Sequence, residues 1–179
     1  MASTAQQSRS FTGPALFSFG FRPFFLLGAA WAAMAVALWL PLLTGTIELP
    51  TALSPIEWHV HELIYGYVPA VVAGFLLTAV PNWTGRLPVV GTPLIVLLAL
   101  WIAGRVAVTT SAMIGPEIAG AIDASFLLAL AAVVGREVVA GRNWRNLRVL
   151  LPLGVLALGN VLFHVEAGSS AGTGYGSRL

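Results

Sequence analysis

The sequence contains no cysteine and no lysine, and only 9% of its 179 residues are charged. Without cysteine the chain can have no disulfide framework, no thiolate metal site, no iron–sulfur cluster and no cysteine nucleophile. Any bound metal must therefore use imidazole, carboxylate, thioether or phenol ligands. The nine basic residues are all arginines that are scattered or lie beside apolar runs. This pattern favours a role in membrane orientation over nucleic-acid binding.

Hydrophobic residues make up 58% of the chain, and its charged fraction is far below the roughly 25% of soluble domains. The apolar residues form five runs of about the length that crosses a hydrocarbon core of about 30 Å. The first run exceeds the 7–15 or so residues of a signal-peptide core, so we expect it to remain uncleaved. We predict an all-α, polytopic transmembrane helix bundle with about five spans, near residues 24–43, 63–80, 89–108, 118–134 and 147–165.

The composition divides the chain into three parts. Residues 1–18 are polar and are predicted to form a cytoplasmic leader, and residues 19–166 hold the helix bundle. Residues 167–179 are rich in glycine and serine, which is typical of a flexible outer-side loop. Because the chain stops within this loop-like segment, we expect it to be part of a longer protein.

Arginines fall in alternate loops. The loops after the first and third spans have none, whereas one side of the predicted bundle carries Arg9, Arg22, Arg86, Arg136, Arg142, Arg145 and Arg148. Positive charge is enriched on the cytoplasmic side of membrane proteins. The N-terminus is therefore predicted to be cytoplasmic, and the connection before the second span to face outward.

The segment 58–62, with the sequence WHVHE, leads directly into the second apolar run. It contains His59, His61 and Glu62 where a membrane helix begins. Ionisable groups at such positions are costly and are candidates for function by default. His164 lies near the end of the outward-running fifth span, so the topology predicts that all three histidines share one membrane level.

Further charged residues belong to the same outer layer. Arg105 is about 24 Å along the third span at a rise of 1.5 Å per residue. Asp123 lies within the fourth apolar run, where an acid needs a partner, and Arg105 is the partner we expect. Glu117 and Glu166 belong to this layer as well. Imidazoles with a nearby guanidinium suit a metal or haem site, with arginine pairing with propionates, and copper also accepts imidazole ligands.

The spacing of the two motif histidines leaves two arrangements open. On a helix, His59 and His61 point about 200° apart, whereas in an extended segment they share one face. Pro55 favours extended structure at the residue before it, which would allow both to bind one ion. A helix that begins before His59 would separate them. A plain interfacial role of the histidines, and an Arg105 that only reaches to the membrane surface, are the alternatives to a ligand site.

Three segments carry a resemblance to a known family. In this order and spacing they resemble the NnrS family of bacterial membrane proteins, and they comprise residues 20–25 (GFRPFF), 58–62 (WHVHE) and 74–86 (GFLLTAVPNWTGR). The resemblance covers essentially all of this chain but only about the first half of a family member. The remaining half of the family fold is therefore an expected partner.

The resemblance implies a haem- and copper-containing protein of the bacterial inner membrane, linked to nitric oxide metabolism and resistance to nitrosative stress. It implies that His59 and His61 are ligands. We add His164 as a metal ligand from the topology, and Glu62 and Arg105 as cofactor-binding residues from the outer layer.

Two functional classes remain open, and a third alternative is that this half only packs against a partner half that carries the chemistry. A haem–copper redox protein is one, whether or not it turns over a substrate. The other is a proton- or ion-coupled transporter, with Asp123, Arg105 and the His–Glu cluster as a relay. The sequence shows no nucleophile–base arrangement and no nucleotide-binding loop, which argues against a hydrolase or a nucleotide-dependent enzyme.

Overall fold

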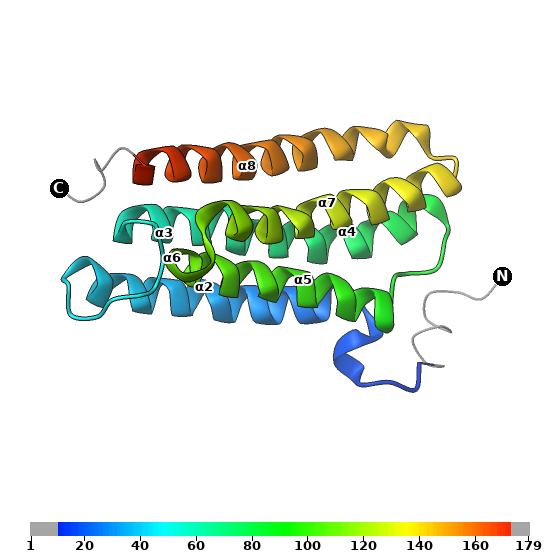
Figure 1. The fold of residues 1–179 in the computed structure, drawn as a ribbon. Helices are drawn as coiled ribbons and strands as arrows, with labels where there is room; N and C mark the ends of the chain where they lie inside the picture. Colours follow the sequence, from blue (N-terminus) through cyan, green and yellow to red (C-terminus); the bar gives the residue numbers. More distant parts are fainter. Residues whose placement is uncertain (1–10, 173–179) are drawn as a thin grey trace.

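The structure of this chain, a computed structural model, describes residues 11–172, with side chains as far as residue 168. Within these residues there is no β-strand, and five helical segments are long and apolar enough to cross a membrane. They lie lengthwise beside one another in a bundle (Figure 1). The all-α, five-span prediction is confirmed. The first span is α2 (Phe21–Leu43), and the second consists of α3 (Pro55–His61), η2 (Glu62–Tyr67) and α4 (Val68–Thr84). The third is α5 (Thr92–Thr109), the fourth is α7 (Pro116–Ala140), and the fifth consists of η3 (Trp144–Val149) and α8 (Leu150–Gly172).

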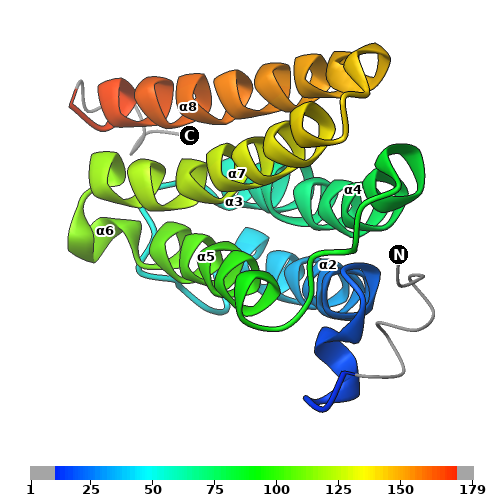
Figure 2. The same cartoon turned by 90° about the vertical axis from the view of Figure 1, so that its right-hand side faces the viewer.

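Helix α7 packs against both α5 and α8, while α2 packs against α4 (Figure 2). The core between these helices is apolar and includes Phe24, Leu94 and Leu130, which have no exposed surface. The outward faces are apolar too, with Leu26 and Leu151 exposed. Helices that are apolar on all sides suit a bundle surrounded by lipid, so the packing agrees with a polytopic membrane protein.

A short 3-10 helix, η1 (Ala15–Ser18), precedes the first span. The Nη1 atom of Arg22 donates a hydrogen bond to the Ala15 carbonyl at 2.8 Å and another to Ser18 Oγ at 2.7 Å. This part of the predicted leader is therefore attached to the start of α2. The first ten residues of the leader lie outside the described residues.

The last helix continues past the predicted end of the fifth span at residue 165. Helix α8 reaches Gly172, and residues 166–172 contain no proline that would stop a helix. The rest of the predicted tail, residues 173–179, lies outside the described residues.

The second span begins well before its apolar run, at Pro55. Ser54 caps this helix start: its Oγ accepts a hydrogen bond from the Glu57 N–H at 3.3 Å, and Glu57 Oε2 accepts one from the Ser54 N–H at 2.8 Å. This reciprocal capping box, with proline in the first turn, stabilises a helix start here. His59 and His61 therefore stand on one helix and point about 200° apart.

Directly after α3 the helix widens into the π-helical segment η2. Pro69 has no N–H to donate to the Tyr65 carbonyl four residues earlier, which disfavours regular α-helical pairing at this point. The carbonyl of Gly66 accepts a hydrogen bond from Trp101 Nε1 of α5 at 2.8 Å. Such π turns are frequent at functional sites, and this one begins at Glu62, next to the buried polar cluster described below.

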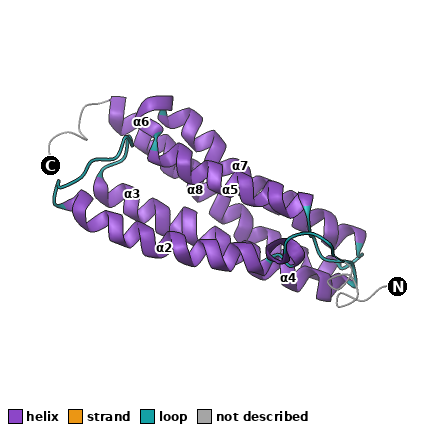
Figure 3. Ribbon diagram, turned by 90° about the horizontal axis from the view of Figure 1, so that it is seen from below, coloured by secondary structure: helices purple, strands orange, loops and turns teal. Residues whose placement is uncertain are grey.

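The spans alternate in direction, so their connections gather at two ends of the bundle (Figure 3). One end, where α2 begins and α4 ends, we call the arginine end; it carries Arg22, Arg86, Arg136, Arg142, Arg145 and Arg148. The other, where α3 begins and α8 ends, we call the histidine end; it carries Glu48, Glu57, Glu117 and Glu166. The short helix α6 (Ser111–Ile114) lies there as well.

Candidate metal centre

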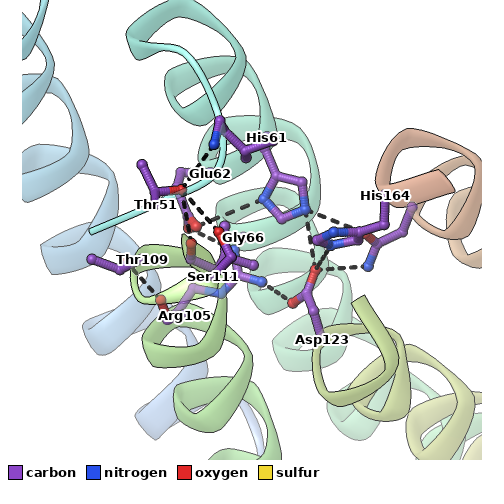
Figure 4. A network of polar contacts seen from close by, with 12 residues as sticks. Thr51, His61, Glu62, Gly66, Arg105, Thr109, Ser111, Asp123 and His164 are labelled. Atoms are coloured by element: carbon purple, nitrogen blue, oxygen red, sulfur yellow. Dashed lines mark hydrogen bonds and ion pairs between the residues drawn. The ribbon is translucent and has the colours of Figure 1, made fainter. Parts of the chain in front are cut away.

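Three helices bring two imidazoles and one carboxylate together inside the histidine end. His61 ends α3 and is completely buried, and its Nε2 atom lies 3.2 Å from Oδ2 of Asp123 on α7. His164 on α8 approaches the same oxygen with its Nε2 at 3.4 Å. Figure 4 shows both imidazoles beside the Asp123 carboxylate. Ligand atoms from these three residues all lie within 4.8 Å of one another.

Asn160 lies one helical turn before His164 on α8 and is completely buried. Its Nδ2 atom donates a hydrogen bond to Asp123 Oδ2 at 2.9 Å, and its Oδ1 lies 3.3 Å from His61 Nε2. A single amide therefore contacts both the carboxylate and one imidazole, which orients the two groups toward each other.

Arg105 on α5 connects Asp123 to a second buried carboxylate. Its Nη1 donates a hydrogen bond to Glu62 Oε2 at 2.6 Å, and its Nη2 donates one to Asp123 Oδ1. Trp31 of α2 donates from Nε1 to the same Glu62 oxygen at 2.7 Å. The predicted pairing of Arg105 with Asp123 is confirmed. Because Arg105 is only 2% exposed, its side chain lies inside the bundle and not at its surface.

The charges of this cluster do not balance. It holds the carboxylates of Glu62 and Asp123, the guanidinium of Arg105 and two imidazoles, all buried. When both imidazoles are neutral, one negative charge remains without a partner, and buried charge of this kind is costly. The Oε1 atom of Glu62 and the Nδ1 atom of His61, 3.6 Å apart, make no hydrogen bond. The cluster is therefore short of one positive charge, which a metal ion or a proton would supply.

Glycines make room for the cluster. A Cβ at Gly120 would lie 2.8 Å from both Cβ and Cγ of His164, closer than real Cβ atoms approach. A Cβ at Gly104 would meet the Asp123 side chain, and one at Gly66 would meet the guanidinium. Each glycine lets a polar side chain lie against the backbone of a neighbouring helix, as small residues do in membrane bundles.

The structure places one predicted ligand elsewhere. His59 points away from the cluster and is half-buried, stacked on Trp39 of α2 with 4.2 Å between ring centroids and 15° between the ring planes. The two motif histidines therefore do not share one ion. The predicted residues that the structure does bring together are His61, Glu62, Arg105 and His164.

Two members of the cluster escaped the sequence reasoning, and a third was assigned only in part. Asp123 was expected as a partner of Arg105 or in a relay, but not as a ligand. Asn160 leaves a signal in the sequence, because it is an amide in an apolar run, four residues before His164 and thus on the same helix face. Trp31 leaves none, since an indole in a span equally suits the core or the membrane interface.

The donor set fits a transition-metal ion. Imidazole and carboxylate bind such ions at about 2.0–2.2 Å, which puts neighbouring ligand atoms roughly 3.4 Å apart in a tetrahedral site. The separations of 3.2 and 3.4 Å around Asp123 Oδ2 agree with that spacing. Imidazole nitrogen is a common ligand of copper, iron and zinc.

Among the described residues, the groove beside the cluster offers no histidine to a haem. A groove of about 320 Å³ lies beside the cluster, lined by α2, α3 and α5, and Arg105 forms part of its wall. Its lining includes Trp31, Trp58 and Trp101, and no histidine or tyrosine. Met34 also lines the groove. In cytochromes c a methionine ligates haem iron together with a histidine, and the lining of this groove has no histidine. The imidazole that remains, His59, does not line this groove; it is stacked on Trp39, and its Nδ1 has no hydrogen-bond partner within the described residues.

Comparison with known proteins identifies a family. No curated protein and no solved structure matches this chain. The sequence model of one family, described as NnrS protein, matches residues 15–178. That range includes all five spans and every residue of the buried cluster. The chain therefore belongs to the NnrS family.

Proposed function

We propose that this chain is a metal-binding membrane protein in which His61, Asp123 and His164 hold a copper ion. The observation that carries this proposal is the convergence of their ligand atoms within 4.8 Å inside the bundle. The uncompensated negative charge of the buried cluster supports it, since a cation at this position would offset the charge of Glu62 and Asp123 that Arg105 leaves uncompensated; copper(I) would balance it and copper(II) would leave one positive charge. A bound copper ion would supply one-electron redox chemistry.

The surrounding residues act on the ligands. Arg105 holds one oxygen of the Asp123 carboxylate and Asn160 holds the other, so the orientation of this carboxylate is determined from both sides. Glu62 in turn holds Arg105 and accepts the Trp31 N–H. Such outer partners set the geometry and basicity of metal ligands.

We further propose that the protein acts in nitric oxide metabolism and in resistance to nitrosative stress, in the bacterial inner membrane with the arginine end in the cytoplasm. Membership of the NnrS family supports the first part. The collection of arginines at one end supports the orientation. The resemblance implies haem as well as copper, but the groove beside the cluster has no histidine or tyrosine that could ligate a haem iron.

The test compares two histidine variants of the full-length protein, purified in detergent after expression with added copper. The His164→Ala variant should bind copper more than about 100-fold more weakly, because changes in outer partners alone cost 10–100-fold. The His59→Ala variant removes the same chemical group outside the cluster and should retain copper. Metal analysis measures the copper content of both variants, and the electron paramagnetic resonance spectrum of the oxidised protein reports the ligands of copper(II).

Two results would overturn this assignment. Equal loss of copper from the His59 and His164 variants would mean that the cluster is not the binding site. A wild-type protein that is folded but free of copper would remove the metal-binding proposal altogether.

The continuity of the buried cluster favours a second candidate, proton- or ion-coupled transport. Glu62, Arg105, Asp123 and the two imidazoles form an unbroken chain of ionisable groups inside the bundle, as proton relays do. The contacts of 3.2 and 3.4 Å also suit hydrogen bonds. Proton uptake by metal-free proteoliposomes that disappears in Asp123→Asn would support transport, whereas bound copper without proton flux would exclude it.

A further inference from the structure

A second convergence of charged side chains lies at the arginine end, remote from the metal centre. A pocket of about 390 Å³ is formed there by the loop between α4 and α5 together with the last turns of α7. Its charged lining consists of Arg86, Arg136 and Glu137. The remaining lining comes from the loop and the start of α5, and it is apolar: Leu87, Pro88, Val89, Val90 and Pro93.

Glu137 holds both arginines in place. Arg86 donates from Nε to Glu137 Oε2 at 2.5 Å, and Arg136 donates from Nε and Nη2 to Glu137 Oε1 at 3.0 and 2.7 Å. The side chain of Glu137 is 9% exposed, whereas those of Arg86 and Arg136 are 43% and 72% exposed. The pocket therefore has a buried acid that positions two accessible guanidinium groups, with one positive charge in excess.

The residues around the pocket add positive charge and include tryptophans of the kind found at the lipid head groups. Asn143, in the turn between α7 and α8, donates from Nδ2 to the Trp83 carbonyl at the end of α4 at 2.6 Å, which joins this turn to the pocket region. The turn and the following η3 carry exposed arginines at 142, 145 and 148. The indoles of Trp83 and Trp144 are exposed at the same end, as expected for residues at the lipid head groups.

We propose that this pocket binds an anionic phospholipid, with the phosphate on Arg86 and Arg136 and an acyl chain along the apolar lining. The occupant is negative because the pocket carries excess positive charge. It is amphiphilic because valine, leucine and proline form the other wall. Guanidinium groups bind phosphate through paired hydrogen bonds, and basic pockets of spanning helices bind anionic head groups.

Setting membrane topology does not by itself require this geometry. The orientation rule counts arginines in loops and needs no contact among them. Here two arginines from different elements share one nearly buried carboxylate beside an apolar wall. Arg145 lies at the same end but does not line the pocket, so it offers a control with the same change of charge.

The test uses full-length protein purified in detergent, titrated with mixed micelles of dioleoylphosphatidylglycerol and followed by its thermal unfolding. Dioleoylphosphatidylcholine and inorganic phosphate are the comparison probes. The anionic lipid should raise the unfolding temperature more than either. The Arg86→Gln and Arg136→Gln variants should each weaken its apparent affinity more than about tenfold, because each removes charge-assisted hydrogen bonds to the phosphate. Arg145→Gln removes only the diffuse attraction of one exposed arginine, so it should weaken the affinity no more than about fivefold, and less as salt is added.

The Glu137→Gln variant separates lost binding from damaged folding, because the two change the affinity in opposite directions. Glutamine keeps an amide oxygen that can accept hydrogen bonds from the arginines, but it removes the negative charge that competes with the phosphate. Binding of the anionic lipid should therefore become stronger, whereas misfolding would weaken it. Equal weakening by Arg145→Gln and Arg86→Gln would overturn the proposal in favour of diffuse attraction. Equal stabilisation by phosphatidylcholine, or by inorganic phosphate alone, would overturn it as well. None of these outcomes depends on the metal centre.

Discussion

The two ends of the bundle carry charge in opposite ways. At the histidine end, Asp123 and Arg105 are 3% and 2% exposed and depend on other side chains for their hydrogen bonds. At the arginine end, Arg136 is largely exposed and water can replace its partner. Loss of one member of a buried network strands the others, whereas an exposed ion pair is worth little. The same types of residue should therefore differ greatly in how much they matter.

The largest effect should come from Asp123→Ala. This variant removes the acceptor shared by Arg105, Asn160 and two imidazoles, and leaves a buried guanidinium without one of its carboxylates. The free energy of unfolding in detergent should fall by about 3–5 kcal/mol. A cost below about 1 kcal/mol, the usual range of exposed pairs, would show that the two ends do not differ.

Next comes Gly120→Ala, which tests the close packing of α7 on α8. The added methyl group would press on His164, and overpacking of this kind costs about 1–3 kcal/mol. Gly154→Ala is the matched control, because a Cβ there meets nothing within 4 Å and alanine is the better helix former. If both variants unfold at the same temperature, the close approach at Gly120 does not contribute to the site.

A smaller effect is expected from Trp31→Phe, which keeps an aromatic ring and removes the N–H bonded to Glu62. In water-soluble proteins, loss of a buried hydrogen bond to a charged group lowers the free energy of unfolding by about 1.5–3 kcal/mol. Between membrane helices such bonds contribute less, so we expect a loss of about 1 kcal/mol here. Trp39→Phe removes an indole N–H that has no partner within the described residues and should be nearly neutral. Equal losses in both variants would point to ring packing as the cause.

The smallest effect should come from Arg136→Gln measured without anionic lipid. The side chain of Arg136 is 72% exposed, and Glu137 keeps its bond from Arg86. The expected loss in free energy of unfolding is about 0–1 kcal/mol, and it should shrink as salt is added. A larger loss that does not change with salt would mean that the ion pair of Arg136 and Glu137 behaves like the buried ion pairs of the histidine end.

Much of the site could be predicted from particular residues. An acid within an apolar run requires a partner in lipid, and this requirement alone led from Asp123 to Arg105. The common level of His61 and His164 followed from alternating spans. The position of His59 did not follow, because its direction depends on where the helix begins. The segment from Ser54 to Glu57 holds a capping box that would have settled this question.

The number of the spans, and the collection of arginines at one end, were determined by the sequence itself. Hydrophobic length and loop charge are local properties that depend on no other part of the chain. Which faces meet was decided only by the tertiary structure. The rotation of each helix about its axis depends on small contacts, such as Gly120 against His164 and the π turn at Glu62. In the resulting packing His61 is completely buried in the cluster, whereas His59 is stacked on Trp39.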